Sequence, residues 1–290
     1  MDLINVVTVF MTAKRADGLA ASTLRDYERA LARLTDYFNT VGDLDRDTVR
    51  AYAVRIRSNG WAEGTCNLHL RYIRAFLRWL WCDGYTSENL ALAIKAPRPT
   101  VRWEELLTTE ELQALLDACT GTWRARDRAI ILFLVDTGMR RGEFIGLTRA
   151  QVHFDNEGAW LLFDAPKNGN RRYAVLGVTA ARALRAYLDA RDDSDPALWV
   201  GENGPLGYHG VYRMLRRRAV DAGIEPSKVH PHAFRKVFAT WWIKNGGDEQ
   251  RLMALGGWSG PEMLRIYVRL GNLDALRAGH ADYSPVDNLE

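Results

Sequence analysis

A short proline-containing segment divides the chain and limits it to folds with two separate parts. In Ala96-Pro97-Arg98-Pro99-Thr100, each proline disfavours the helical conformation in the residue before it. Such a segment is typical of a stiff, extended linker. The length of 290 residues agrees with about two domains. We therefore expect domains over residues 1–96 and 105–290, joined by a linker over residues 97–104.

Composition excludes several classes of protein. With 47% apolar and 26% charged residues, the chain is not wholly disordered. Its longest apolar run, residues 129–135, is too short to span a bilayer, and no basic residues precede the apolar stretch at the N-terminus as they would in a signal peptide. The three cysteines are an odd number without CxxC spacing, which argues against a disulfide framework or a zinc site. They fit a reducing cytoplasm.

The first hundred residues show the three-and-four spacing of apolar side chains that indicates amphipathic helices. Helices are expected after Ser22, over residues 48–58 and over residues 63–81. In the last of these, Arg71, Arg74 and Arg78 lie within about 60° of one another, opposite the apolar face. Such a stripe is most simply a solvated surface; the alternative is a surface that lies against phosphates.

The second part is predicted to be mostly helical with a small antiparallel sheet. Thr108 and Glu111 have the spacing of a capping box before an apolar run. Residues 159–176 alternate with a period of two around Asn168-Gly169, which predicts a β-hairpin. The fold class is therefore mainly α. Further helical patterns cover residues 127–136, 179–190, 208–222, 232–244, 248–255 and 261–270.

The small net charge of +3 conceals an uneven distribution. Residues 1–100 carry 14 basic and 11 acidic side chains, whereas the remainder carries 25 of each. A uniformly basic nucleic-acid binder is excluded, but a patterned one is not, because local charge decides such binding.

Five short motifs resemble, in order and spacing, those of the tyrosine recombinase (phage integrase) family. They are Thr137-Gly138-Met139-Arg140-Arg141-Gly142-Glu143, a lysine in the hairpin, His230-Pro231-His232-Ala233-Phe234-Arg235, Leu255-Gly256-Gly257-Trp258, and Tyr267 nine residues after Trp258. The resemblance extends to the helical pattern of the first hundred residues. It implies a SAM-like core-binding domain followed by a catalytic domain, in the layout of Cre, Xer and short phage integrases without an additional arm-binding domain.

The chemistry of phosphodiester cleavage and the resemblance to the family assign the same roles to these motif residues. A tyrosine hydroxyl that attacks a DNA phosphodiester needs positive charge at the non-bridging oxygens, and two guanidiniums can supply it. Arg140 and Arg235 would form this clamp, with Glu143 supporting Arg140. Tyr267 would become a 3′-phosphotyrosine that conserves the bond energy for rejoining. Tyr283, in the polar C-terminal tail, is its competitor.

Proton transfer involves a further group of residues. Lys167 in the hairpin would protonate the leaving 5′-oxygen, with Arg171 or Arg172 as alternatives. His232 would act as a base or hydrogen-bond partner, and Trp258 would donate its indole N–H to the phosphate unless it is a core residue. His230 is interpreted as a capping or packing residue. The scheme requires no metal and no nucleotide, so no cofactor is expected.

With this chemistry, both clusters of arginines favour contact with DNA. They are Arg71, Arg74 and Arg78, and the run Arg213, Arg216, Arg217 and Arg218. Phosphate contacts would dominate the affinity and make it salt-dependent. The expected partners are double-stranded DNA attachment sites and further copies of the chain in a tetramer, held by a short C-terminal helix that follows the break at Gly271 within residues 268–277. A directionality factor is considered as a further partner, and no association with a membrane is expected.

The leading interpretation is a cytoplasmic, nucleoid-associated recombinase of a bacterial or phage-infected cell that integrates phage or mobile-element DNA through a Holliday junction. Trp258 in place of histidine and Lys236 after Arg235 favour it over an Xer-like, dimer-resolving recombinase. A catalytically silent DNA-binding relative and a nicking–closing enzyme like the type IB topoisomerases remain as further candidates.

Overall fold

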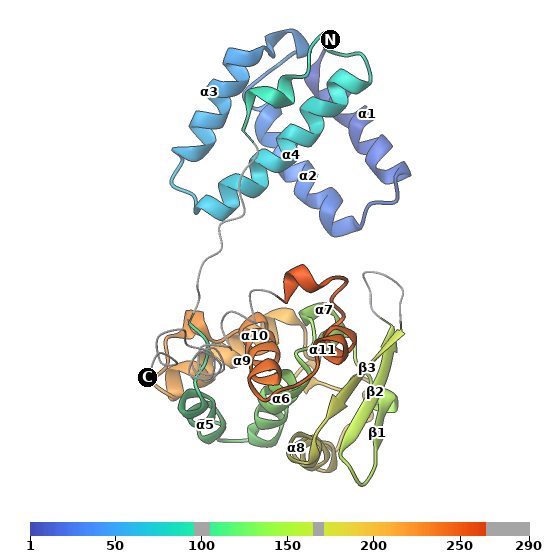
Figure 1. Cartoon of the computed structure of the whole chain (residues 1–290), viewed down its shortest axis with the longest axis vertical. Helices are drawn as coiled ribbons and strands as arrows, with labels where there is room; N and C mark the ends of the chain where they lie inside the picture. Colours follow the sequence, from blue (N-terminus) through green and yellow to red (C-terminus); the bar gives the residue numbers. More distant parts are fainter. Residues whose placement is uncertain (96–104, 165–170, 265–290) are drawn as a thin grey trace, which may run out of the picture. The chain divides into compact units, whose positions relative to one another are not determined.

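The computed structural model describes residues 1–95, 105–164 and 171–264, and the chain divides into two compact units, Met1–Trp103 and Glu104–Glu290 (Figure 1). The expected linker, the turn that carries Lys167 and the segment that carries Tyr267 lie outside the described residues. Within the described ranges, no helix is long and apolar enough to cross a membrane.

The first unit is helical, as predicted. The sequence did not single out its first helix, which Asp2 caps by accepting a hydrogen bond from the backbone N–H of Asn5 at 3.0 Å. The core centres on Phe10, whose ring makes edge-to-face contacts with Tyr27, Phe76 and Trp79. The elements are α1 (Leu3–Ala16), α2 (Ala21–Thr35), η1 (Val41–Asp43), α3 (Arg46–Arg57), α4 (Glu63–Cys82) and η2 (Leu90–Ala93).

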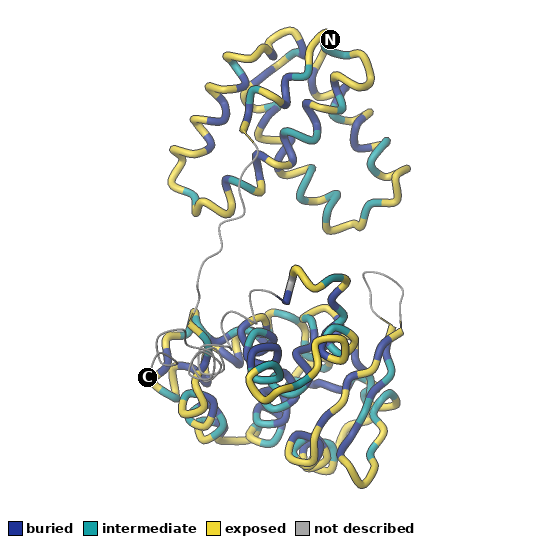
Figure 2. Tube along the Cα trace, viewed as in Figure 1, coloured by how far each residue is buried: buried dark blue, intermediate teal, exposed yellow. Residues whose placement is uncertain are grey.

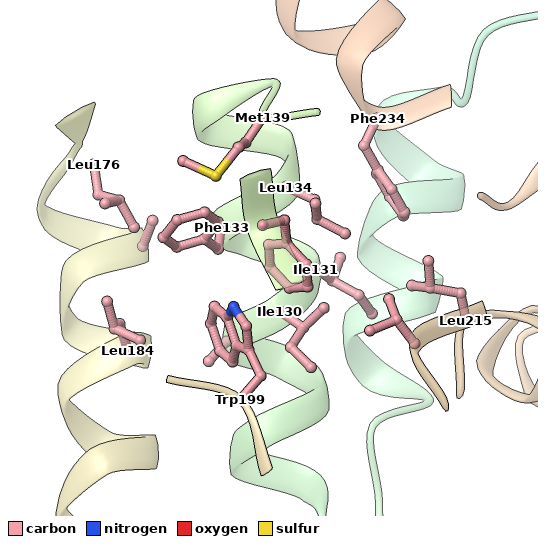
Figure 3. Close-up of a cluster of buried hydrophobic side chains, with 14 of the residues drawn as sticks. Ile130, Ile131, Phe133, Leu134, Met139, Leu176, Leu184, Trp199, Leu215 and Phe234 are labelled. Carbon is pink, nitrogen blue, oxygen red and sulfur yellow. The ribbon is translucent and has the colours of Figure 1, made fainter. Parts of the chain in front are cut away.

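The second unit is built around one buried helix. This helix, α6 (Arg124–Thr137), packs against the helices Val178–Asp189 and Pro231–Lys244 and contributes Ile130, Phe133 and Leu134 to the core (Figure 3). Burial of these side chains is the main stabilising contribution of the unit. The remaining helices are α5 (Thr109–Asp117), α7 (Arg141–Ile145), η3 (Arg149–Gln151), α8 (Val178–Asp189), α9 (Tyr208–Asp221), η4 (Pro226–Lys228), α10 (Pro231–Lys244), α11 (Glu249–Gly256) and η5 (Pro261–Met263).

The predicted hairpin is confirmed. Strands β2 (Ala159–Asp164) and β3 (Arg171–Leu176) pair antiparallel, and β1 (Val152–Phe154), which the sequence did not reveal, adds to β2. The aromatic residues that show the alternation, Trp160 and Tyr173, lie on the outer face. The inner face buries Leu161, Ala174 and, against expectation for a strand of a small sheet, Arg172. A second ladder joins β4 (Val200–Gly201) to β5 (Gly204–Pro205).

The segment over residues 261–270, which was predicted to be an α-helix, does not begin as one. The described part of this segment is the 3₁₀ turn η5, which Pro261 opens. Residues from 265 onward lie outside the described chain. Figure 2 shows that buried residues alternate with exposed ones along the helices of both units, which is the pattern that the three-and-four spacing predicts.

Candidate active site

A sharp turn between α6 and α7 presents Arg140. Gly138 ends α6 in the left-handed conformation with φ of 53°, and a Cβ there would lie 2.4 Å from the ring of Phe238. Only glycine satisfies both constraints. The chain then enters α7, where the Glu143 carboxylate accepts a hydrogen bond from the Arg140 backbone N–H at 2.9 Å. The turn thereby fixes the backbone from which the Arg140 side chain extends.

Helix α10 presents His232 and Arg235 three residues apart. Pro231 occupies its first turn, and Nδ1 of His230 caps the helix by accepting from the Ala233 N–H at 3.2 Å. The capping role that was predicted for His230 is thus confirmed. His232 is exposed, whereas Arg235 is 4% exposed.

Three arginines converge on the end of α11. Arg172 donates to the carbonyl of Leu255 at 2.6 Å, Arg235 donates to Gly256 at 2.8 Å, and Arg140 donates to Gly257. These are three consecutive carbonyls at the C-terminus of a helix, where the helix dipole favours cations. Arg235 also donates to the carbonyl of Gly138 at 2.7 Å. The two arginine motifs, far apart in sequence, are therefore joined into one site.

Trp258 lies within this site and not in the main core. The guanidinium carbon of Arg235 is 3.8 Å from the centre of the Trp258 ring, a close cation–π contact. A Cβ on Gly256 would lie 1.8 Å from that ring, so the glycine leaves room for the indole. The ring belongs to a small apolar cluster with Phe238 and Leu252.

A pocket of about 670 Å³ opens over these groups. It brings together four of the six predicted catalytic residues, and the other two, Lys167 and Tyr267, lie outside the described residues. A concave, cation-lined surface suits an anionic group such as a phosphodiester. The lining includes Arg140, Arg141, Tyr208, His232, Arg235 and Trp258.

Arg172, which the sequence offered only as an alternative to Lys167, lies buried beside the site. Its side chain is 9% exposed and forms an ion pair with Glu143, which is 5% exposed and also pairs with Arg140 at 3.2 Å. Burial lowers the pKa of Arg172, and the Glu143 carboxylate opposes that shift. The available signal was position: residue 172 shares the inner face of β3 with Ala174 and Leu176, and a cation there requires a buried partner.

The arginine stripe on α4 has mixed surroundings. Arg71 and Arg78 are exposed, but Arg74 is half-buried and donates to the Ile94 carbonyl at 2.8 Å. Part of the Arg74 guanidinium is therefore engaged within its own unit.

On α9, Arg213, Arg216 and Arg217 are exposed, and two of them line a second pocket of about 560 Å³ beside the β4–β5 turn. The expectation of DNA contact was wrong for Arg218. It is 7% exposed and pairs with the buried Asp127 at 2.8 Å, because its position falls on the inward face of α9.

Comparison with known proteins defines the class. The sequence pattern of the Phage integrase family matches residues 105–272, and the pattern of the phage integrase N-terminal SAM-like domain matches residues 12–84. The chain therefore belongs to the phage integrase family. It is a site-specific tyrosine recombinase, an enzyme of the class that cuts and rejoins DNA strands.

Similar proteins include Xer recombinases. Tyrosine recombinase XerD of Halalkalibacterium halodurans is 27% identical over 268 residues, which cover 87% of this chain and 88% of the relative. Tyrosine recombinase XerA of Thermococcus kodakarensis is 29% identical over 269 residues, covering 91% and 90%.

Two solved structures share the fold. The Tn1549 transposon integrase in complex with circular intermediate DNA has a TM-score of 0.76 at 19% identity, covering 96% of this chain and 99% of that one. A lambda integrase dimer bound to a COC′ core site has a TM-score of 0.75 at 17% identity, covering 92% and 77%.

Proposed function

We propose that this enzyme recombines DNA at specific attachment sites through a 3′-phosphotyrosine on Tyr267 and a Holliday junction. The observation that carries the proposal is that Arg140, which caps α7, and Arg235 of α10 donate to neighbouring carbonyls and line one pocket. Two guanidiniums held side by side can contact both non-bridging oxygens of a phosphodiester.

In the cleavage step, the Tyr267 oxygen attacks phosphorus and the bond to the 5′-oxygen breaks. Negative charge accumulates on the two non-bridging oxygens, where Arg140 and Arg235 stabilise it. The 3′-phosphate remains bound to tyrosine, and attack by the 5′-hydroxyl of another strand releases the tyrosine and completes the exchange.

The proton transfers are assigned to the remaining candidates. Lys167 donates a proton to the leaving 5′-oxygen, and His232, exposed at the pocket, accepts or shares the proton of the nucleophile. Trp258 supports the clamp through its contact with the Arg235 guanidinium and donates its indole N–H to the phosphate.

We assign residues 1–96 to DNA core binding, residues 97–104 to the linker and residues 105–290 to catalysis. The surfaces assigned to DNA are Arg71, Arg74 and Arg78 on α4, and Arg213, Arg216 and Arg217 on α9. Exposure of all but Arg74, which is half-buried, supports this assignment. Replacing one such arginine by alanine should weaken binding to all DNA sequences. It should also reduce the slope of the logarithm of the binding constant against the logarithm of the salt concentration by about one.

The assembly is proposed as a tetramer on two sites, held by the short C-terminal helix expected after Gly271, and the location as cytoplasmic and nucleoid-associated. The biological role is integration of phage or mobile-element DNA, with a directionality factor as a further partner. Xer-like dimer resolution is the second candidate, because similar curated proteins are Xer recombinases. The target distinguishes them: a recovered site beside the gene would favour integration, and a site at a distant chromosomal locus would favour dimer resolution.

Covalent trapping tests the reaction. The purified protein is incubated with a pool of nicked duplexes that carry randomised cores, and adducts that survive SDS are amplified to recover the site. We expect adducts with the wild type and none with Tyr267→Phe. Adducts that persist in Tyr267→Phe but disappear in Tyr283→Phe would assign the nucleophile to the tail. On the recovered site, Arg140→Ala and Arg235→Ala should each slow cleavage at least ~10²–10³-fold.

A further inference from the structure

The buried carboxylate of Glu143 is shared by two guanidiniums. Arg140 donates to one oxygen at 3.2 Å through its side chain and to the other at 2.9 Å through its backbone N–H, and Arg172 pairs with the second oxygen. The Glu143 and Arg172 side chains are 3% and 9% exposed, whereas that of Arg140 is 37% exposed and lines the pocket. The carboxylate therefore lies below the pocket, between the cation that faces substrate and one that does not.

This arrangement raises a problem of charge. A buried carboxylate that paired with Arg140 alone would cancel the charge that a phosphodiester requires, because the pair would be neutral and screening by water is weak beneath the pocket. With Arg172 present, two guanidinium charges and one carboxylate charge leave a net charge of +1. Only Arg140 among the three reaches the pocket lining, so that charge is available there.

We propose that Arg172 is a positioning residue that neutralises Glu143 and so keeps the charge of Arg140 available to the scissile phosphate. The inference rests on the proposed function, since it assigns Arg140 to the clamp. Arg172 also holds the carbonyl of Leu255 at 2.6 Å, next to the carbonyls that Arg235 and Arg140 hold. One side chain thereby sets both the charge of the clamp and the end of α11 that contacts it.

Stability does not account for the buried cation. Arg172 lies over the ring of Phe163 at 5.0 Å, and within the described part of the chain its Nε–H has no hydrogen-bond partner. A buried charge with an unsatisfied N–H is costly, and a whole buried ion pair can often be replaced by neutral residues without loss of stability. The structure thus points to a role of Arg172 in charge in addition to its contacts within the fold.

The test uses the full chain and a nicked duplex with the recovered core site. Single-turnover cleavage is measured for wild type, Arg140→Gln, Arg172→Gln, Glu143→Gln/Arg172→Gln, and a control, Arg185→Gln. Arg185 is an exposed arginine of α8 that stacks on Phe154 and is absent from the pocket lining. Thermal unfolding of each variant confirms that it is folded.

We expect Arg172→Gln to slow cleavage about 10–100-fold, the range typical for loss of a residue that orients a contacting group. In the double variant, Arg140 is the only charge left in the group, so its net charge returns to +1 and at least part of the lost cleavage rate should be recovered. The cleavage rate of Arg185→Gln should match that of the wild type. On a duplex with a methylphosphonate at the scissile position, which lacks the ionised oxygen, the defect of Arg172→Gln should shrink.

The outcomes separate the charge role of Arg172 from the clamp role of Arg140. Equal defects of Arg172→Gln on the phosphodiester and the methylphosphonate, with no recovery in the double variant, would overturn the charge role. If Arg140→Gln is inactive while Arg172→Gln cleaves like the control, the inference fails and the proposed clamp stands. If Arg140→Gln cleaves normally, the proposed function itself fails.

Discussion

Two adjacent glycines at the end of α11 determine how closely the site residues approach one another. Gly257 has φ of +67°, and a Cβ there would lie 2.7 Å from Nη1 of Arg172 and 2.8 Å from Nη1 of Arg140. Gly256 leaves the space that the Trp258 ring fills. At this scale the site depends on the absence of side chains as much as on the arginines themselves.

Gly257→Ala should therefore impair the site more than the fold. The left-handed conformation costs an alanine about 1–2 kcal/mol, and the methyl group also displaces two guanidiniums. We expect cleavage to fall by about 10–100-fold. Gly246→Ala is the matched control, because Gly246 has φ of +78° and no heavy atom within 4 Å of its would-be Cβ. Equal activity of the two variants, measured with unfolding curves alongside, would contradict the account.

Sequence alone predicted much of the site because its motifs are local. The turn at Gly138, the cap at His230 and the spacing of His232 and Arg235 each depend on a few consecutive residues, and the structure brings them together. The burial of Arg172 and its ion pair with Glu143 were not predictable in the same way. Its partner Glu143 lies 29 residues away in the chain, and only the register of β3 reveals that position 172 faces inward.

At the scale of elements, a buried ion cluster holds α9 in place. Asp127 on α6 accepts from Arg126 at 2.7 Å and from Arg218 at 2.8 Å, and Arg126 also donates to the Val200 carbonyl of β4 at 3.1 Å. Arg218 further donates to the Ala118 carbonyl at 3.0 Å. The cluster fixes the helix that presents the exposed arginines of α9.

Asp127→Asn should strongly destabilise the second unit. It leaves the buried Arg126 without a carboxylate and Arg218 with only the more exposed Asp221, and breaking a buried pair in this way costs about 3–5 kcal/mol. The control is Asp164→Asn, which removes only an exposed pair with Arg171 worth about 0–1 kcal/mol. Both are compared with the wild type by urea unfolding. Loss of less than about 1 kcal/mol in Asp127→Asn would show that the cluster does not stabilise α9.

In the first unit, α3 and α4 meet at a buried histidine. His69 is 7% exposed, its Nε2 lies 2.8 Å from the Tyr52 hydroxyl, and burial lowers its pKa from 6.5 to about 4. The unfolded chain therefore binds this proton at a higher pH than the folded chain does. Stability from this residue is complete above pH 6.5 and is lost as the pH falls toward 4.

The corresponding experiment compares wild type with His69→Gln, which keeps a polar partner for Tyr52 but does not titrate. Between pH 6.5 and 4.5 we expect the wild type to lose up to ~1.4 kcal/mol per pH unit more than the variant. Calorimetry over this range measures the difference. Parallel curves for the two proteins would mean that His69 is protonated in the folded state as readily as in the unfolded one.

Helices and the hairpin were predictable because their apolar periodicity is strong, as on α2 and α4. Helix α1 and strand β1 were not singled out. Helix α1 opens with a nearly continuous apolar run, Leu3–Val9 interrupted by Asn5 and Thr8, which hides the three-and-four spacing. Strand β1 has three residues, too few to show a period of two.

For the whole molecule, a net charge of +3 is a poor guide to its partner. Carboxylates such as Asp127 and Glu143 are buried against arginines, whereas other arginines, including Arg71 and Arg213, are exposed. Among the described residues, four arginines and two acids are buried, so the total counts charges of both signs that lie below the surface. Local arrangement, and not net charge, is consistent with an enzyme that acts on DNA.

The central claim is that Tyr267 forms the covalent bond to DNA, and identification of the modified peptide tests it most directly. Trypsin cleaves after Arg265, Arg269 and Arg277, so Tyr267 falls in peptide 266–269 and Tyr283 in peptide 278–290. After trapping on a nicked duplex and digestion with nuclease and trypsin, mass spectrometry should find a nucleotide joined through its 3′-phosphate to peptide 266–269. The same modification on peptide 278–290 would contradict the account.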